Sequence, residues 1–166
     1  MMVKKSLAVL VTGLILLQTG LLIAAEDKKA EEKLAVKFIQ DANLVFKTQG
    51  EAAGMAAIGD YGPTAKFFKG ELYVFLMTTD DGVLQAHPKL KGKNIMMLKD
   101  AKGKAFVQEF IALGKSGKSG WVEYLWTNPT SKEIDPKKTY IEPLSIKYQG
   151  RDAILGCGIY NADGKK

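Results

Sequence analysis

A long helix followed by strand-rich sequence is the feature that most limits the fold of this chain. From residue 26 to about residue 49, apolar residues recur at the spacing of one helix face, with lysines and acids on the other face. The apolar positions are Leu34, Phe38, Ala42 and Val45. Gly50 is placed to end the run, and a second short helix is expected over residues 51–58, before the turn signals of GDYGP.

The rest of the chain is dominated by strand-like runs. Residues 71–87 read as an antiparallel hairpin around the turn TDDG, and Pro88 takes the chain out of the sheet. Residues 88–104 carry several turn signals and predict an irregular crossover, after which a helix is expected from Phe106. Three further strands, expected as a meander, cover residues 121–126, 139–148 and 153–160. This order predicts one α+β domain, with the long N-terminal helix packed on an antiparallel sheet of about five strands.

The first 25 residues differ in character from the rest. A short positive segment precedes an uncharged apolar run, and charged residues follow at once, which is typical of a secretory signal cut after Ala25. The run is nearly long enough to span a bilayer, so an uncleaved anchor is the alternative. We therefore expect residues 1–25 to be a signal peptide or an anchor, and residues 26–166 to form a periplasmic or secreted domain. Membrane contact is expected only if the N-terminal segment is retained.

Composition argues against several classes of function. The 24 Lys and Arg exceed the 18 Asp and Glu by six, but the lysines are scattered without interleaved aromatic residues, so no nucleic-acid partner is expected. One histidine and one cysteine are too few for a zinc site, and no haem motif is present, so no cofactor or metal is expected. Cys157 has no disulfide partner within the chain. Because no nucleophile motif is found, we expect no enzymatic activity.

Aromatic and cationic side chains gather in the second half of the predicted sheet. Trp121, Tyr124 and Trp126 lie on one strand, and Lys137 and Tyr140 lie at the head of the next. Such side chains suit a small pocket in which a lysine holds a carboxylate. Strand alternation puts Tyr124 and Trp126 on one face and Trp121 on the other, so packing against the long helix is the alternative for each aromatic residue.

Three stretches carry a resemblance to a known family: KGELYVFLMTTDDGVLQAHPKLKGKNIMMLKDAKGKAFVQEFI, SGWVEYLWTNPTSKEIDPKKTYIEPL and ILGCGIY. From about Phe68 to Tyr160 they resemble, in order and spacing, the single Cache family of extracytoplasmic sensor domains. The resemblance implies a PAS-like (profilin-like) antiparallel sheet behind a long N-terminal helix, no catalytic residues, and a periplasmic pocket for a small ligand, often a short carboxylate. The ligand-binding residues that it implies are His87, Trp121, Tyr124, Trp126, Lys137 and Tyr140.

The resemblance also shapes the functional hypotheses. Many relatives continue into a second membrane helix and a signalling module, whereas this chain stops soon after the last predicted strand. We therefore expect a stand-alone periplasmic sensor that binds a small organic anion and signals through a partner such as a membrane receptor or a histidine kinase. The alternative is a non-catalytic structural or protein-interaction domain with a vestigial pocket. Two roles remain for His87: a position at the rim of the ligand pocket, or a structural role where the chain leaves the strand.

Overall fold

The computed structural model describes residues 6–160, with side chains described from Glu26 onward. The elements are α1 (Ser6–Gly59), β1 (Phe68–Lys69), β2 (Leu72–Thr78), β3 (Leu84–Ala86), α2 (Phe106–Ser116), β4 (Gly120–Thr127), β5 (Ile134–Pro143) and β6 (Ala153–Tyr160). The expected signal peptide or anchor of residues 1–25 lies outside the residues with described side chains and stays a prediction. In the part of the chain that the structure describes, no helix is both long enough and apolar enough to cross a membrane.

Helix α1 is broken where the sequence predicts, because Gly50 has φ 86° and ψ 177° and lies outside the helical region. Its fully buried residues recur at spacings of three and four, but the centre of this face is shifted by one residue from the expected stripe. The buried residues are Ala35, Ile39, Ala42 and Phe46, while the expected Leu34, Phe38 and Val45 are partly buried at the edges of the face. The helix therefore packs on the sheet through a face centred on Ile39, Ala42 and Phe46.

The sheet has the order β1-β2-β6-β5-β4, and β3 pairs with β2 outside this path. Every pairing is antiparallel, and the last three strands form the expected meander. Strand β6 lies between β2 and β5, so both of its edges are paired, and side-chain clusters cover both of its faces, so all eight of its residues are buried. The lone Cys157 lies on this strand and is fully buried.

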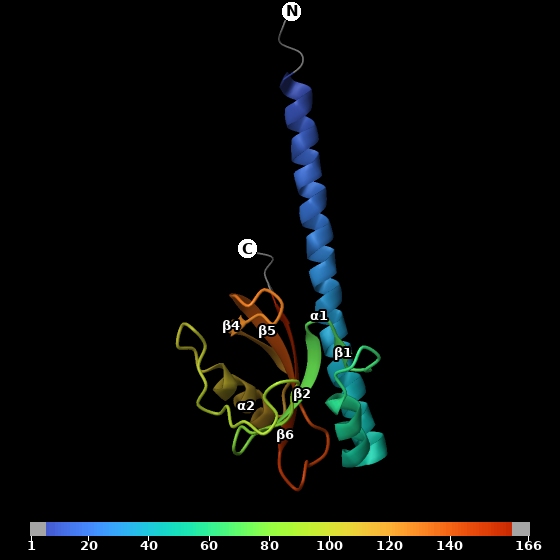
Figure 1. Cartoon of the computed structure of the whole chain (residues 1–166), viewed down its shortest axis with the longest axis vertical. Helices are drawn as coiled ribbons and strands as arrows, with labels where there is room; N and C mark the ends of the chain where they lie inside the picture. The colour runs from blue at the N-terminus through green and yellow to red at the C-terminus, as the bar shows by residue number, and fades with distance from the viewer. Residues whose placement is uncertain (1–5, 161–166) are drawn as a thin grey trace, which may run out of the picture.

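Two layers of side chains pack against the two faces of the sheet. Figure 1 shows α1 alongside one face and α2, with the irregular crossover, over the other. The α1 face holds a core cluster that includes Phe46, Leu155 and Cys157, and the α2 face holds one that includes Phe106, Phe110 and Ile154. The expected PAS-like α+β arrangement of a long helix on an antiparallel sheet is therefore confirmed.

Strand β5 begins earlier than the sequence suggests. It covers residues 134–143, not the expected 139–148, and contains Pro136. Proline is tolerated there because, among the described residues, β5 pairs at Pro136 with Leu125 of β4 alone, and the pairing with β6 starts at Lys137. The earlier start places Lys137 inside the strand.

A buried amide ties α1 to the end of β5. Asn43 is 8% exposed; its Nδ2 donates to Glu142 Oε1 at 2.7 Å and to the carbonyl of Pro143 at 3.0 Å. Its Oδ1 accepts the backbone N–H of Ser145 at 2.8 Å. These bonds fix the position of the helix relative to the sheet.

We expect Asn43→Leu to lower the free energy of unfolding by about 3 kcal/mol, because the partners of a buried amide lose their hydrogen bonds at about 1–3 kcal/mol each. Urea unfolding measures the change. The neighbouring Leu44→Asn is the matched control, since Leu44 is 57% exposed and its replacement leaves the core intact. Equal stability of Asn43→Leu and wild type would contradict this role.

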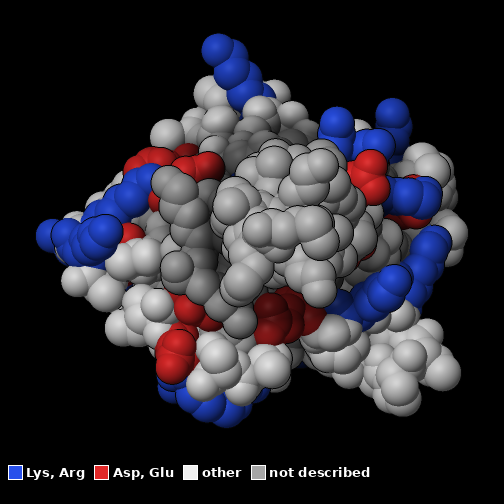
Figure 2. Space-filling view, turned by 90° about the horizontal axis from the view of Figure 1, so that it is seen from above, with Lys and Arg blue, Asp and Glu red and all other residues white. Residues whose placement is uncertain are grey.

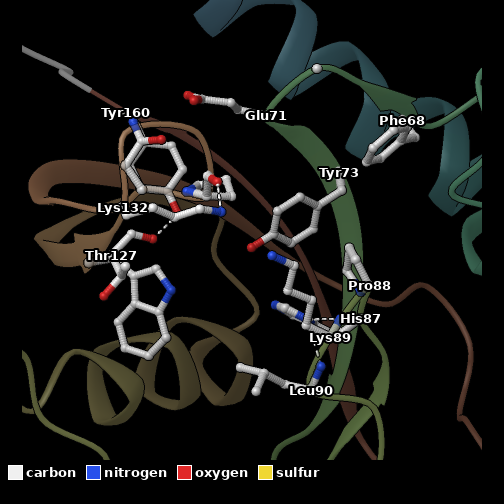
Figure 3. Close-up of a pocket in the computed structure, with 14 residues that line it drawn as sticks. Phe68, Glu71, Tyr73, His87, Pro88, Lys89, Leu90, Thr127, Lys132 and Tyr160 are labelled. Atoms are coloured by element: carbon white, nitrogen blue, oxygen red, sulfur yellow. Dashed lines mark hydrogen bonds between the residues drawn. The ribbon is translucent and has the colours of Figure 1, made fainter.

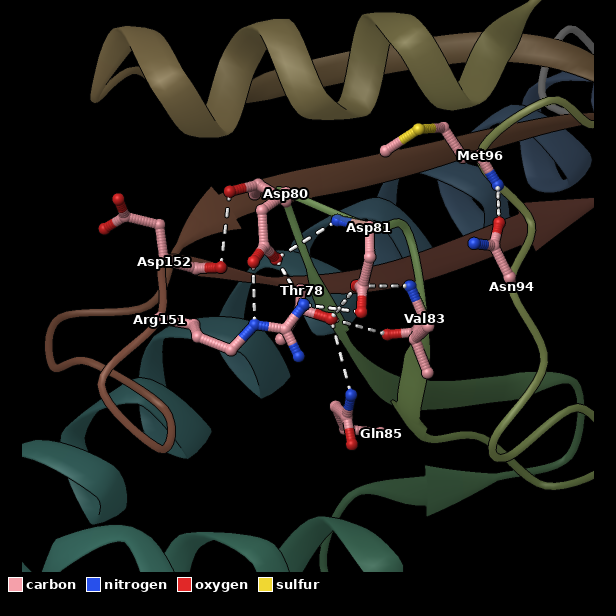
Figure 4. Close-up of polar contacts among 10 residues, drawn as sticks. Thr78, Asp80, Asp81, Val83, Gln85, Asn94, Met96, Arg151 and Asp152 are labelled. Carbon is pink, nitrogen blue, oxygen red and sulfur yellow. Dashed lines mark hydrogen bonds and ion pairs between the residues drawn. The ribbon is translucent and has the colours of Figure 1, made fainter.

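A charged cluster, shown in Figure 4, joins the β2–β3 turn to the β5–β6 turn. Arg151, in the β5–β6 turn, donates through Nε to Asp80 Oδ2 at 2.8 Å and forms an ion pair with Asp81 at 2.5 Å. The hydrogen bond from Arg151 holds the pKa of Asp80 below its ordinary value. Thr78 Oγ1 donates to Asp81 Oδ1 at 2.6 Å and closes the β2–β3 turn. The cluster thus links two turns that lie far apart in the sequence.

Candidate functional site

A cavity of about 360 Å³ opens between the start of β2, the chain after β3, the end of β4 and the last residue of β6. Its lining includes Glu71, Tyr73, His87, Leu90, Trp126 and Tyr160, and Figure 3 shows these elements surrounding the hollow. A smaller hollow of about 30 Å³, lined also by Lys137, shares Tyr73, His87 and Trp126 with it. The smaller hollow lies against the α2 face of the sheet, and we name it the floor of the cavity.

Lys137 is a buried cation at this floor. It is 3% exposed, and its Nζ donates to the hydroxyls of Tyr73 at 3.3 Å and Tyr160 at 3.2 Å. The Tyr160 ring lies 4.4 Å from the ammonium group, which adds a cation–π contact. Among the described residues, no carboxylate forms a salt bridge with Lys137. Burial lowers the pKa of Lys137, although Tyr160 opposes this shift. A buried charge without a counter-ion is costly, so this site favours an anion.

The two tyrosines differ in the use of their hydroxyls. Tyr160 Oη accepts from Lys137 and donates to the carbonyl of Thr127 at 3.1 Å, so both functions are used. Tyr73 Oη accepts from Lys137, and among the described residues its own proton has no acceptor. Burial raises the pKa of Tyr73, which keeps its hydroxyl protonated. Tyr73 therefore offers a free O–H donor.

His87 closes the turn after β3 and faces the same cavity. Its Nδ1 accepts the backbone N–H groups of Lys89 at 3.0 Å and Leu90 at 3.1 Å. The neutral ring consequently carries its proton on Nε2, for which the described part of the chain provides no acceptor. Burial, aided by the charges of Lys137 and Lys89, lowers the pKa of His87 to about 4. At neutral pH the ring is uncharged, so His87 combines a structural turn with a donor at the cavity.

Three hydrogen-bond donors at the cavity and its floor have no acceptor among the described residues. They are the hydroxyl of Tyr73, Nε2–H of His87, and the one ammonium proton of Lys137 that the two tyrosines leave free. A carboxylate accepts several hydrogen bonds and donates none, so it matches this set of donors. Apolar side chains, including Leu90 and Trp126, form the surrounding walls. The arrangement suits an anionic head group on a small organic molecule.

The sequence of this chain matches the model of a known protein family. A family model described as the Cache domain matches residues 61–165, which is more than half of the chain. The chain belongs to the Cache domain family. Cache sensor domains are non-catalytic sensing modules.

Individual relatives agree with this membership. The chain is 31% identical over 78 residues to the methyl-accepting chemotaxis protein McpP of Pseudomonas putida; the match covers 47% of this chain and 14% of that protein. The crystal structure of a methyl-accepting chemotaxis protein from Vibrio parahaemolyticus superimposes with a TM-score of 0.60 at 24% identity, covering 82% of this chain and 95% of that one.

Another solved structure, described as the structural basis for carboxylic acid recognition by a Cache chemosensory domain, gives a TM-score of 0.50 at 25% identity, covering 88% of this chain and 96% of that one.

This Cache domain brings some of the predicted binding residues to the cavity and leaves others away from it. His87 and Trp126 line the main cavity, and Lys137 and Tyr124 line its floor. Tyr124 is a wall residue: its ring stacks on Phe106 at 4.1 Å and its hydroxyl is bonded to Thr139 Oγ1 at 2.9 Å. That these residues bind a ligand stays a prediction.

Trp121 and Tyr140 do not lie at the cavity. They pair across β4 and β5 with ring centres 5.3 Å apart, and both pack against the α1 cluster on the opposite face. Both side chains therefore pack against the α1 side of the sheet and do not line the cavity. The structure instead adds Tyr73 and Tyr160, which the sequence did not single out because their approach to Lys137 depends on β2 and β5 flanking β6.

The strand ends at the floor are also tied to α1. Lys28 Nζ donates to the carbonyl of Tyr160 at 2.9 Å, and Glu32 forms a 2.6 Å ion pair with Lys138. Lys138 follows Lys137 on β5, and Lys137 is the register partner of Tyr160. Consequently, α1 holds from behind the two strand ends whose side chains form the floor of the cavity.

Proposed function

We propose that this chain is a periplasmic sensor domain that binds a short carboxylate in the cavity of about 360 Å³ and signals through a partner, a membrane receptor or a histidine kinase. The observation that carries the proposal is Lys137, a cation that is 3% exposed, lines the floor beside the cavity and forms no salt bridge with a carboxylate in the described part of the chain. The ligand carboxylate supplies the missing counter-ion and accepts from Tyr73 and His87.

Relatives support this choice of ligand class and location. The Cache chemosensory domain described for carboxylic acid recognition is similar over most of this chain. A second similar structure is described as the periplasmic sensor domain of a chemotaxis protein, with a TM-score of 0.56 at 22% identity over 85% of this chain and 97% of that one. The signal-like segment of residues 1–25 agrees with a periplasmic location.

The test is thermal unfolding of the protein, as purified after expression, against a panel of acetate, propionate, pyruvate, succinate, neutral amides and amines. A ligand that binds only the folded state adds about 2.7 kcal/mol at a hundred times its dissociation constant, which gives a clear rise in midpoint. We expect a rise with at least one carboxylate and none with its neutral amide. An unchanged midpoint across all the carboxylates would contradict the proposal and leave a protein-interaction domain with a vestigial pocket.

Tyr73→Phe tests a single donor of the site. We expect the affinity for the carboxylate to fall about tenfold, because one hydrogen bond to a charged acceptor is lost while the ring remains. Tyr140→Phe is the matched control, since Tyr140 lies on the α1 face of the sheet. Titration calorimetry measures both variants, and equal losses of affinity in the two would argue against a direct bond from Tyr73.

A further inference from the structure

Two glycines on the central strand form the floor beneath the site. Residues 154, 156, 158 and 160 of β6 alternate toward the α2 face, where Ile154 joins the α2 cluster and Tyr160 lines the cavity. The two positions between them are Gly156 and Gly158, so the middle of this strand presents bare backbone to the site. Side chains from the neighbouring strands fill the space.

Each glycine is covered by a different kind of side chain. A Cβ atom at Gly156 would lie 2.2 Å from the ring of Phe75. A Cβ atom at Gly158 would lie 2.2 Å from Cε and 3.1 Å from Nζ of Lys137, and 2.7 Å from Oγ1 of Thr139. Lys137 pairs in register with Tyr160, so its side chain reaches along the sheet to lie over Gly158. Its ammonium group therefore rests directly on the backbone of β6.

We propose that Gly158 is the positioning residue of the site: its bare backbone lets the ammonium group of Lys137 lie flat on the sheet between Tyr73 and Tyr160, with the cavity above left open. The effect of Gly158 on ligand binding rests on the proposed function, whereas its effect on the position of Lys137 does not. Glycine is required here by close approach, and no positive φ restricts the position to glycine.

Gly158→Ala gives a defined change in geometry. The far end of a lysine is flexible and moves away from the new methyl group, whereas Oγ1 of Thr139, 2.7 Å from the new Cβ, gives way at some cost in stability. At Gly156→Ala the nearest atoms all belong to the rigid ring of Phe75. With β6 below it, the displaced ammonium group moves up into the cavity. We expect the affinity for the carboxylate to fall at least about tenfold, because the group then occupies the place of the ligand and leaves the tyrosine hydroxyls.

A double-mutant cycle tests the positioning role without any ligand. Urea unfolding is measured for wild type, Lys137→Ala, Gly158→Ala and the double variant, and in parallel for a cycle with Thr139→Ala. We expect Gly158→Ala to lower the unfolding midpoint less when Lys137 has been shortened. Additive effects with Lys137→Ala, or coupling with Thr139→Ala alone, would overturn the proposal.

Two further readouts separate positioning from a general loss of packing. NMR titration of the labelled lysine should show the pKa of Lys137 rising toward its ordinary value in Gly158→Ala, because the displaced group gains contact with water. An unchanged pKa would overturn the proposal. The thermal unfolding panel gives the second readout. If a carboxylate raises the unfolding midpoint of Gly158→Ala as much as that of wild type, the proposal is also overturned. If wild type itself shows no rise, the proposed function fails, and the cycle and the pKa still decide the role of Gly158.

Discussion

Lys137→Met will lose the response to carboxylates and, without ligand, will be more stable than wild type. Truncating one member of a buried charged pair costs about 2–5 kcal/mol of binding, so the affinity should fall at least about thirtyfold. Buried ionic groups replaced by apolar residues of similar volume leave a fold as stable or stabilise it by about 1–4 kcal/mol, and we expect a gain here because Lys137 has no salt-bridge partner among the described residues. The opposite signs of the two effects identify a residue kept for binding at the expense of stability.

Calorimetric titration and urea unfolding measure the two effects of Lys137→Met. Lys138→Met is the matched control, because Lys138 is the next residue of β5 but faces α1 and pairs with Glu32. The control should lose stability and keep its affinity for the carboxylate. If Lys137→Met instead binds as wild type does, the cavity is not an anion site built around this lysine.

The second large effect is a dependence of stability on pH through His87. In the folded protein its pKa is about 4, whereas in the unfolded chain it is near 6.5, so the unfolded state binds more protons between these values. Stability is therefore fully present above about pH 6.5 and declines as the pH falls toward about 4. A shift of this size corresponds to about 3 kcal/mol when fully developed.

His87→Asn separates protonation from the turn. An asparagine side-chain oxygen accepts the backbone N–H two residues later, as Nδ1 does in the native turn, but does not titrate. We expect the stability of His87→Asn, measured by urea unfolding, to be nearly independent of pH between about 6.5 and 5, where wild type already loses stability, and to fall only toward pH 4, where carboxylates such as Asp80 begin to be protonated in the unfolded chain. Parallel curves for the two proteins in this range would show that His87 is not the titrating group.

Local chemistry explains which parts of the fold follow from the sequence. Gly50 predicts the break in α1 because glycine tolerates a backbone conformation that ends a helix, and the run of apolar residues in β6 predicts a strand covered on both faces. The expected start of β5 was wrong because the polar residues before Thr139 are typical of a loop. Their pairing with β4, which brings Leu125 opposite Pro136, depends on the partner strand and has no local signal.

The site was predictable only in part, for reasons of register. Alternation separates Lys137 from Tyr140, three residues later, onto opposite faces, so the sequence already held a reason to divide this pair. By contrast, the approach of Tyr73 and Tyr160 to Lys137 depends on β2 and β5 flanking β6. The room at Gly158 likewise comes from the neighbouring strand and has no local signal.

The most direct measurement is a crystal structure of the protein with the carboxylate that raises its unfolding midpoint most. The account predicts the carboxylate in the cavity, within hydrogen-bonding distance of Lys137 Nζ, the hydroxyl of Tyr73 and Nε2 of His87. A ligand bound elsewhere on the molecule, or in the cavity with its carboxylate turned away from Lys137, would contradict it.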